Sequence, residues 1–208
     1  MKVKICGIKS VEVAHHAVNA GADALGFVFA PSKREISPEQ AKGIIKELPQ
    51  ETWKVGVFVN ETPEKIVEIA EAVGLTHIQL HGEEQVSPYK GQDNILIKSV
   101  SVKSESDIDK VGEIEADYIL LDSPPSLYKG GNGTSFNWSL ASKLKASNKI
   151  LLAGGLNAEN VQQAIQTVKP YMVDVSSGVE TDGEKDPIKI SIFINEAKGI
   201  REDEEDEN

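Results

Sequence analysis

The sequence alternates between short apolar runs rich in β-branched residues and longer segments in which apolar residues recur at helical spacing. Eight units of this kind can be counted within 208 residues. Strict alternation predicts parallel strands joined by helices, and eight units in so short a chain favour a closed barrel over an open, doubly wound sheet. We therefore predict the α/β class, as a single (β/α)8 barrel over residues 1–200, because no linker or change in composition divides this domain. The expected strands are Val3–Ile5, Ala24–Phe29, Lys54–Val59, His77–Leu80, Ile95–Ser99, Tyr118–Leu121, Ile150–Ala153 and Met172–Val175.

Several of the intervening helices have clear start signals. Ser37-Pro38-Glu39-Gln40 is a capping box with proline at the first helical position. Thr62-Pro63 and Asp186-Pro187 open two later helices in the same manner. The weaker signals lie at Ser10, at Ser104 and, for the fourth helix, around Glu83–Tyr89.

Charge and composition exclude several classes of protein. The net charge is −11, and Arg201 is followed by six consecutive acids, so the tail at 201–208 carries −5 and the rest of the chain −6. We expect this acidic tail to be disordered and solvated, although it could bind a basic partner. The chain lacks the basic surface of a nucleic-acid binder and any apolar run of the ~18 residues that a membrane helix needs. With one cysteine and no secretory signal, we expect a cytoplasmic protein.

Polar residues at the carboxyl ends of the strands are the candidates for chemistry, because barrels of this kind place their active sites there. Cys6 ends the first strand, where its thiol would point to the barrel mouth and Gly7 would leave room beside it. Asp122 ends the sixth strand. A base and an acid on opposite walls of one mouth indicate two proton transfers on one substrate, as in an isomerase. The alternatives are a small buried thiol at Cys6 and a solvated cap at Asp122.

Two small-residue turns lie one strand-helix-strand unit apart near the end of the chain. Gly154 and Gly155 follow the seventh strand, and Asn157 is expected to cap the next helix. Ser176 and Ser177 follow the eighth strand. Glycines let a backbone approach a dianion closely, and phosphate sites of barrels are often built by these two loops. Ordinary strand-helix connections are the alternative.

Three further features complete the candidate site. Arg34, in the loop after the second strand, offers a planar fork suited to a carboxylate, or else is a surface charge. His81 ends the fourth strand and could donate to a substrate or serve a structural role. The glycine-rich loop at 129–136 could fold over a ligand as a lid. We expect no metal site, because the neighbouring His15 and His16 diverge by about 100° on a helix.

Nine segments in order along the chain carry a resemblance that covers Val3 to Gly199. They are KICGI, ALGFVF, SKREIS, VGVFVN, IQLHGEE, LLD, GGNG-x-x-F-x-W, LAGGLNAENV and VDVSSGVE. Together they resemble the phosphoribosylanthranilate isomerase family of tryptophan biosynthesis. Its members are TIM barrels, usually without a cofactor, that convert N-(5-phosphoribosyl)anthranilate to 1-(o-carboxyphenylamino)-1-deoxyribulose 5-phosphate by an Amadori rearrangement. The resemblance implies a small phosphosugar substrate, no cofactor, and a monomer or homodimer.

The resemblance also assigns roles to residues of this chain. Cys6 matches the general base and Asp122 the general acid, while Arg34 matches the arginine that holds the anthranilate carboxylate. His81 and Asp174 match polar residues that line the site. The phosphate-binding loops correspond to Gly154, Gly155, Ser176 and Ser177.

The sixth loop departs from the family pattern. Family members often read G-K-T-F-D-W, whereas Thr134 and Asn137 stand here in place of the lysine and the aspartate. Two other functions stay open on the sequence: another phosphosugar isomerase or epimerase, which would not need Arg34, and a non-catalytic binder of phosphate ligands.

Overall fold

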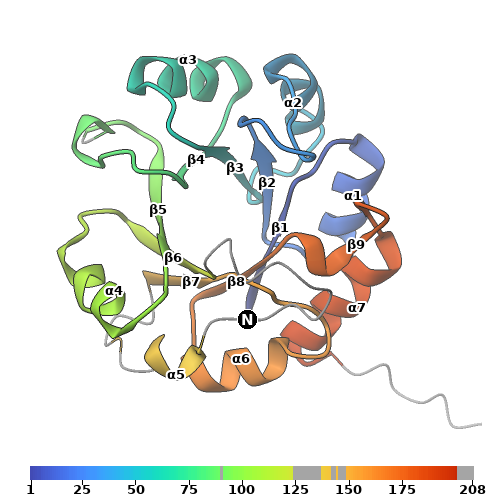
Figure 1. The fold of residues 1–208 in the computed structure, drawn as a ribbon. Coiled ribbons are helices and arrows are strands. Elements are labelled where there is room, and N and C mark those ends of the chain that lie inside the picture. Colours follow the sequence, from blue (N-terminus) through green and yellow to red (C-terminus); the bar gives the residue numbers. More distant parts are fainter. Residues whose placement is uncertain (90, 124–136, 142–143, 145–148, 201–208) are drawn as a thin grey trace, which may run out of the picture.

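Eight parallel strands pair in chain order and close into a barrel, with the helices around its outside (Figure 1). The computed structural model describes residues 1–89, 91–123, 137–141, 144 and 149–200. The predicted fold class is therefore confirmed, and the strand boundaries differ from the predicted ones by at most two residues. The strands are β1 (Lys2–Cys6), β2 (Ala24–Val28), β3 (Trp53–Phe58), β4 (His77–Leu80), β5 (Ile95–Ser101), β6 (Tyr118–Asp122), β7 (Ile150–Leu152) and β8 (Met172–Val175).

Local signals account for most of the helix starts. The Ser37 hydroxyl accepts from the Gln40 N–H while the Gln40 side chain accepts from the Ser37 N–H, which completes the predicted capping box. Ser10, Thr62 and Asp186 also accept from backbone N–H groups of the helices that they precede. The helical elements are α1 (Val11–Asn19), α2 (Pro38–Ile45), α3 (Pro63–Val73), η1 (Ser87–Tyr89), α4 (Glu105–Asp109), η2 (Lys110–Glu113), α5 (Trp138–Ala141), α6 (Val161–Val168), η5 (Ser177–Val179) and α7 (Pro187–Lys198).

Two helix predictions were wrong. The segment around Glu83–Tyr89 forms only the 3-10 turn η1, because Val86 and Tyr89 supply too few apolar residues for a helical face. Asn157 does not cap α6 directly, because α6 begins four residues later. Its Oδ1 instead accepts from the N–H groups of Glu159 and Asn160 in the turn before the helix.

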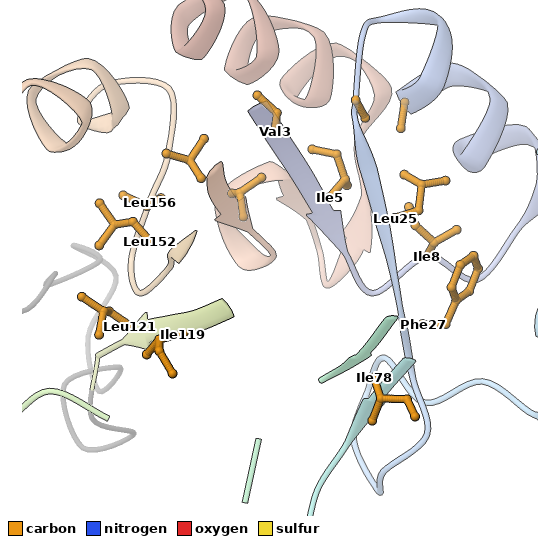
Figure 2. Close-up of a cluster of buried hydrophobic side chains, with 14 of the residues drawn as sticks. Val3, Ile5, Ile8, Leu25, Phe27, Ile78, Ile119, Leu121, Leu152 and Leu156 are labelled. Carbon is orange, nitrogen blue, oxygen red and sulfur yellow. The ribbon is translucent and has the colours of Figure 1, made fainter. Parts of the chain in front are cut away.

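The hydrophobic core has two layers. Outward-facing strand residues such as Val3, Ile5 and Leu25 pack against the helices, as Figure 2 shows for one part of this cluster. A smaller cluster fills the inside of the barrel. It consists of Ala24, Val55, Ile97, Leu120, Leu151, Ala153 and Met172. Because side chains alternate between the two faces of each strand, one strand serves both layers.

Aromatic side chains close the amino-terminal end of the barrel. Trp53 stacks on His77 with ring centroids 3.9 Å apart, and Tyr118 and Tyr171 stack beside them. The ammonium of Lys2 lies over the rings of Trp53 and Tyr171, 5.2 and 5.1 Å from their centroids. This end is filled, which leaves the carboxyl-terminal end of the barrel open for a ligand.

Two sequence predictions lie outside the described residues, namely the disordered tail at 201–208 and the lid at 129–136. Within the described residues, no helix has the length and apolar character needed to cross a bilayer.

Candidate functional site

A cavity of about 670 Å³ opens at the carboxyl ends of the strands. All nine residues that the sequence singled out line it, although they come from six of the eight strand-loop units. They are Cys6, Arg34, His81, Asp122, Gly154, Gly155, Asp174, Ser176 and Ser177. The cavity volume falls within the range of sites that take small organic ligands.

The thiol of Cys6 lies in a space that glycine provides. A Cβ built on Gly26, its partner across β1 and β2, would lie 2.8 Å from the Cys6 Sγ. Gly7 was predicted to leave this room, but a Cβ there would meet Arg34 Cδ at 2.7 Å instead. Burial raises the pKa of the Cys6 thiol, and the nearby Lys4 ammonium offsets part of that rise.

Lys4 lies inside the barrel one inward-facing position below Cys6. Its side chain is 0% exposed, and its Nζ donates to Asp174 Oδ2 at 2.8 Å and to Gln79 Oε1 at 3.1 Å. Burial alone would lower the pKa of Lys4, but the Asp174 carboxylate and Cys6 outweigh burial and raise it. Lys4 is therefore a fixed positive charge beneath the thiol.

Hydrogen bonds extend from Lys4 across the barrel towards Asp122. Gln79 Nε2 lies 3.1 Å from His81 Nδ1, which is also 2.9 Å from Ser99 Oγ. On its other side, His81 Nε2 lies 3.5 Å from Asp122 Oδ2. The second carboxylate oxygen of Asp122 accepts from the Ser123 N–H at 2.7 Å. Polar side chains in contact with one another thus connect the side of the cavity that carries Cys6 with the side that carries Asp122.

The two small-residue loops pack closely against each other. Gly154 and Gly155 both adopt positive φ, at 85° and 67°, which side chains other than glycine rarely adopt. A Cβ on Gly178 would overlap the carbonyl oxygen of Leu156, so the loop after β8 touches the backbone of the loop after β7. Ser176 Oγ donates to the Cys6 carbonyl at 3.1 Å, which ties the same loop to β1. An anion between these loops would meet backbone and hydroxyl groups rather than bulky side chains.

Arg34 reaches the cavity from the loop after β2 and is held there by an acid. Its guanidinium donates through Nε and Nη2 to the two carboxylate oxygens of Glu180, at 2.7 and 2.8 Å. The side chain of Arg34 is 32% exposed and that of Glu180 only 9%. Sequence reasoning did not foresee that the carboxylate-binding arginine would have a carboxylate partner within the chain.

A second cavity, of about 580 Å³, lies beside the loops after β4 and β5. It is lined by charged side chains such as Glu84, Lys98 and Glu113 and holds none of the nine predicted residues.

Among the described residues, no three histidine, cysteine, aspartate or glutamate side chains gather as metal ligands would. The titratable side chains that line the first cavity include a thiol, two carboxylates and an imidazole.

Four functional candidates were missed in the sequence: Lys4, Gln79, Glu180 and Lys185. Strand alternation gives a signal for the first two, because Lys4 and Gln79 lie two positions before Cys6 and His81 on the same inward faces. Glu180 had no such signal, since its partner Arg34 comes from a distant loop, whereas the partners of Lys185, which are Ser176 and Glu180, lie within nine residues of it in the chain.

Comparison with known proteins gives a consistent result. Residues 3–196 match the family model described as N-(5'phosphoribosyl)anthranilate (PRA) isomerase. An N-(5'-phosphoribosyl)anthranilate isomerase of Bacillus cereus (strain B4264) is 55% identical over 200 residues, which are 95% of this chain and 98% of the relative.

Solved structures of such enzymes superpose on nearly the whole chain. A monomeric form of the dimeric phosphoribosylanthranilate isomerase of Thermotoga maritima has a TM-score of 0.84 and 44% identity, and the match covers 96% of this chain and 100% of that one. A phosphoribosyl anthranilate isomerase in complex with reduced 1-(o-carboxyphenylamino)-1-deoxyribulose 5-phosphate has a TM-score of 0.82 and 44% identity, with the same coverage.

Proposed function

The chain belongs to the N-(5'-phosphoribosyl)anthranilate isomerase family, and on this premise we propose how its own residues isomerise that substrate in tryptophan biosynthesis. The product is 1-(o-carboxyphenylamino)-1-deoxyribulose 5-phosphate, and residues 1–200 form the catalytic domain. One observation carries the proposal: Cys6, Asp122, Arg34 and both small-residue loops line a single cavity.

The two ends of the substrate carry its anchoring groups. The phosphate binds between the loop at Gly154 and Gly155 and the loop at Ser176 and Ser177, where backbone N–H groups and hydroxyls can approach a dianion. The anthranilate carboxylate binds to the guanidinium of Arg34. The sugar carbons then lie across the middle of the cavity, between the walls that carry Cys6 and Asp122.

The reaction needs an acid first and a base second. Asp122, in its protonated form, gives a proton to the ribose ring oxygen as the bond from that oxygen to C1 breaks, which leaves a protonated Schiff base. The Cys6 thiolate then takes the proton from C2, and the electron pair of that C–H bond forms the C1–C2 double bond of an enolamine. Transfer of a proton from the 2-hydroxyl to C1 gives the ketone.

The surroundings of each group fit these roles. Gln79 and Ser99 hold the His81 ring through its Nδ1 atom. The Nε2 atom of the same ring lies 3.5 Å from Asp122 Oδ2 and orients this acid. Burial raises the pKa of Cys6, and the Lys4 ammonium offsets part of that rise by stabilising the thiolate. A thiolate kept as a minority species at neutral pH still has high intrinsic basicity, which suits abstraction of a carbon-bound proton.

Direct assay of turnover tests the proposal. N-(5-phosphoribosyl)anthranilate is generated in the cuvette, and the loss of its anthranilate fluorescence is followed on addition of the purified protein. We expect enzyme-dependent decay, with an acid limb in kcat/KM that reports the ionisation of Cys6. Ligand binding without decay would favour a non-catalytic binder. Turnover of other phosphosugars that does not depend on Arg34 would favour another isomerase or epimerase.

Two variants test the assignment of acid and base. Cys6→Ala and Asp122→Asn are each expected to lower kcat by about 10²–10⁴-fold, the usual contribution of one general acid or base. Asp109→Asn is the matched control, because it makes the same change at an exposed position on α4 outside the cavity. Circular dichroism shows whether each variant is folded. Near-normal kcat in either cavity variant would disprove the two-residue mechanism.

A further inference from the structure

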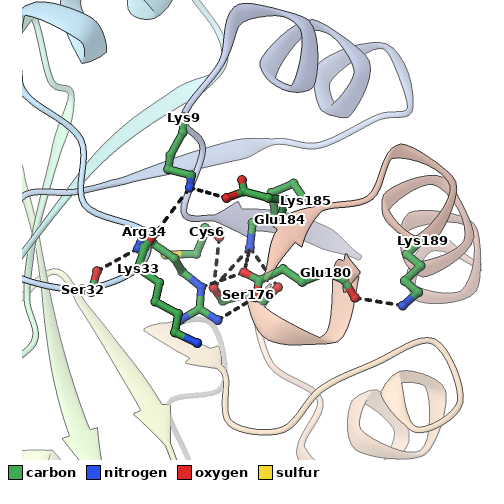
Figure 3. A network of polar contacts seen from close by, with 10 residues as sticks. All are labelled: Cys6, Lys9, Ser32, Lys33, Arg34, Ser176, Glu180, Glu184, Lys185 and Lys189. Carbon is green, nitrogen blue, oxygen red and sulfur yellow. Dashed lines mark hydrogen bonds and ion pairs between the residues drawn. The ribbon is translucent and has the colours of Figure 1, made fainter. Parts of the chain in front are cut away.

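The Arg34–Glu180 pair is part of a larger polar network (Figure 3). On its other side, Glu180 Oε1 accepts from Lys185 Nζ at 2.5 Å. Lys185 is almost fully buried, with a side chain that is 4% exposed, and its Nζ also donates to the Ser176 carbonyl at 2.9 Å. Glu180 is thus held between two cations, one from the loop after β2 and one that contacts the phosphate loop.

A tight hairpin places Glu180 beside Lys185. The strands β9 (Glu180–Thr181) and β10 (Glu184–Lys185) are antiparallel, and Glu180 and Lys185 are direct cross-strand partners. The turn between them is Asp182-Gly183, with φ of 53° and 86°, the left-handed conformation that two-residue hairpins favour. Lys189 Nζ donates to the Glu180 carbonyl at 2.8 Å and so ties the hairpin to α7. The position of the carboxylate is therefore set by backbone geometry.

The charges of the network matter for an anionic ligand. A neutral Arg34–Glu180 pair would attract a substrate carboxylate weakly, because Glu180 cancels the arginine charge. Burial would raise the pKa of Glu180, but hydrogen bonds from Arg34 and Lys185 outweigh it and lower the pKa. Burial lowers the pKa of Lys185, and Glu180 counteracts that effect. With Glu180 ionised and Lys185 protonated, the three groups together carry one positive charge.

We propose that Glu180 and Lys185 are positioning residues that make the site selective for substrates with an aryl carboxylate. Glu180 binds one edge of the guanidinium and fixes its plane, so that the fork meets the substrate carboxylate with little loss of side-chain freedom. Lys185 supplies the compensating charge and links the carboxylate site to the phosphate loop through Ser176. The hairpin thereby fixes the spacing between the two anchoring sites. This inference rests on the proposed function, since it takes Arg34 as the ligand of the anthranilate carboxylate.

A double-mutant cycle tests the inference, using two substrates. Glu180→Gln, Arg34→Ala and the double variant are assayed with N-(5-phosphoribosyl)anthranilate and with the aniline analogue that lacks the carboxylate. For the anthranilate substrate, we expect Arg34→Ala to raise KM by about 10–100-fold, as for loss of a charge-assisted pair. Glu180→Gln should raise KM about tenfold with kcat within twofold of the wild type, and should add nothing in the Arg34→Ala background. Neither change should affect KM for the aniline analogue.

Two further variants complete the experiment, one as a control and one as a test of Lys185. Glu184→Gln is the matched control, because it makes the same change on the same hairpin at a side chain that is 71% exposed and pairs with Lys9 rather than with Arg34. It should leave KM unchanged for both substrates. Lys185→Met, which leaves Glu180 to neutralise Arg34 and also removes the hydrogen bond to the Ser176 carbonyl, should raise KM more for the anthranilate substrate than for the aniline analogue. Thermal unfolding of each variant shows whether it is folded.

The outcomes separate the inference from the function on which it rests. Absence of turnover by the wild-type protein would overturn the proposed function and this inference together. Wild-type turnover with additive effects of Glu180→Gln and Arg34→Ala would overturn the inference alone. Equal KM increases for both substrates would do the same, because they would indicate a general structural role for the hairpin.

Discussion

His77, the buried histidine at the closed end of the barrel, should make the free energy of unfolding decrease as the pH falls through the mildly acidic range. His77 is 2% exposed, stacks on Trp53, and has a ring nitrogen, Nε2, without a hydrogen-bond partner in the described structure. Burial lowers the pKa of His77 from 6.5 to about 4. The unfolded chain therefore binds a proton more readily than the folded protein, and this contribution to stability is lost as the pH falls through the window from 6.5 to about 4.

The size of the effect follows from the two pKa values. Between pH 7.5 and pH 5, His77 alone should lower the free energy of unfolding by about 2 kcal/mol, and by about 3 kcal/mol at pH 4. His77→Phe keeps an aromatic ring against Trp53 but cannot take up a proton. Its free energy of unfolding should therefore fall by about 2 kcal/mol less than that of the wild type over the same change in pH.

Urea unfolding followed by far-UV circular dichroism measures this difference. All other ionising groups are common to the two proteins and cancel in the comparison. For a slope of about 3 kcal/mol per molar urea, the wild-type midpoint should fall by roughly 0.7 M more than that of His77→Phe between pH 7.5 and pH 5. Activity at pH 7.5 should be unchanged, because His77 lies at the end of the barrel opposite the cavity. Equal pH dependence of the two midpoints would refute the reasoning.

Three further predictions concern the cavity. In Lys4→Met, the pH dependence of the rate at which iodoacetamide alkylates Cys6 should shift to higher pH, because the cation that stabilises the thiolate is lost. The reagent reports on one site, because the chain has one cysteine. An unshifted profile in the folded variant would contradict this prediction. The same variant should be less stable by about 3–5 kcal/mol, since Asp174 is left buried without its partner. Gly154→Ala should raise the inhibition constant of inorganic phosphate, because positive φ and overlap with Ser123 displace the loop; an unchanged constant would argue against phosphate binding there.

Most of the fold could be predicted because its signals are local. Alternating apolar runs and helix caps lie within a few neighbouring residues, and the closed barrel follows from their number and order. The fourth helix was predicted from a weak signal, and its segment has only Val86 and Tyr89 as large apolar residues, which support a single 3-10 turn rather than a helical face. The start of α6 was placed too early because Asn157 caps a turn as well as it would cap a helix.

The site was predictable to the extent that topology gathers it. Parallel strands of a barrel end at one rim, so residues at strand ends such as Cys6, His81 and Asp122 meet without any further information. The partners of those residues depend on side-chain reach. The contact of Arg34 with Glu180 joins loops that are far apart in the chain, and neither spacing nor periodicity encodes such a pair.

Because Gly178 packs against the Leu156 carbonyl, the loops after β7 and β8 can change in sequence and length only together. Neither loop can be lengthened, exchanged with a relative or grafted onto another barrel alone, because the backbone of one occupies the space into which the other would grow. A chimaera that exchanges barrel segments should therefore carry both loops from the same parent.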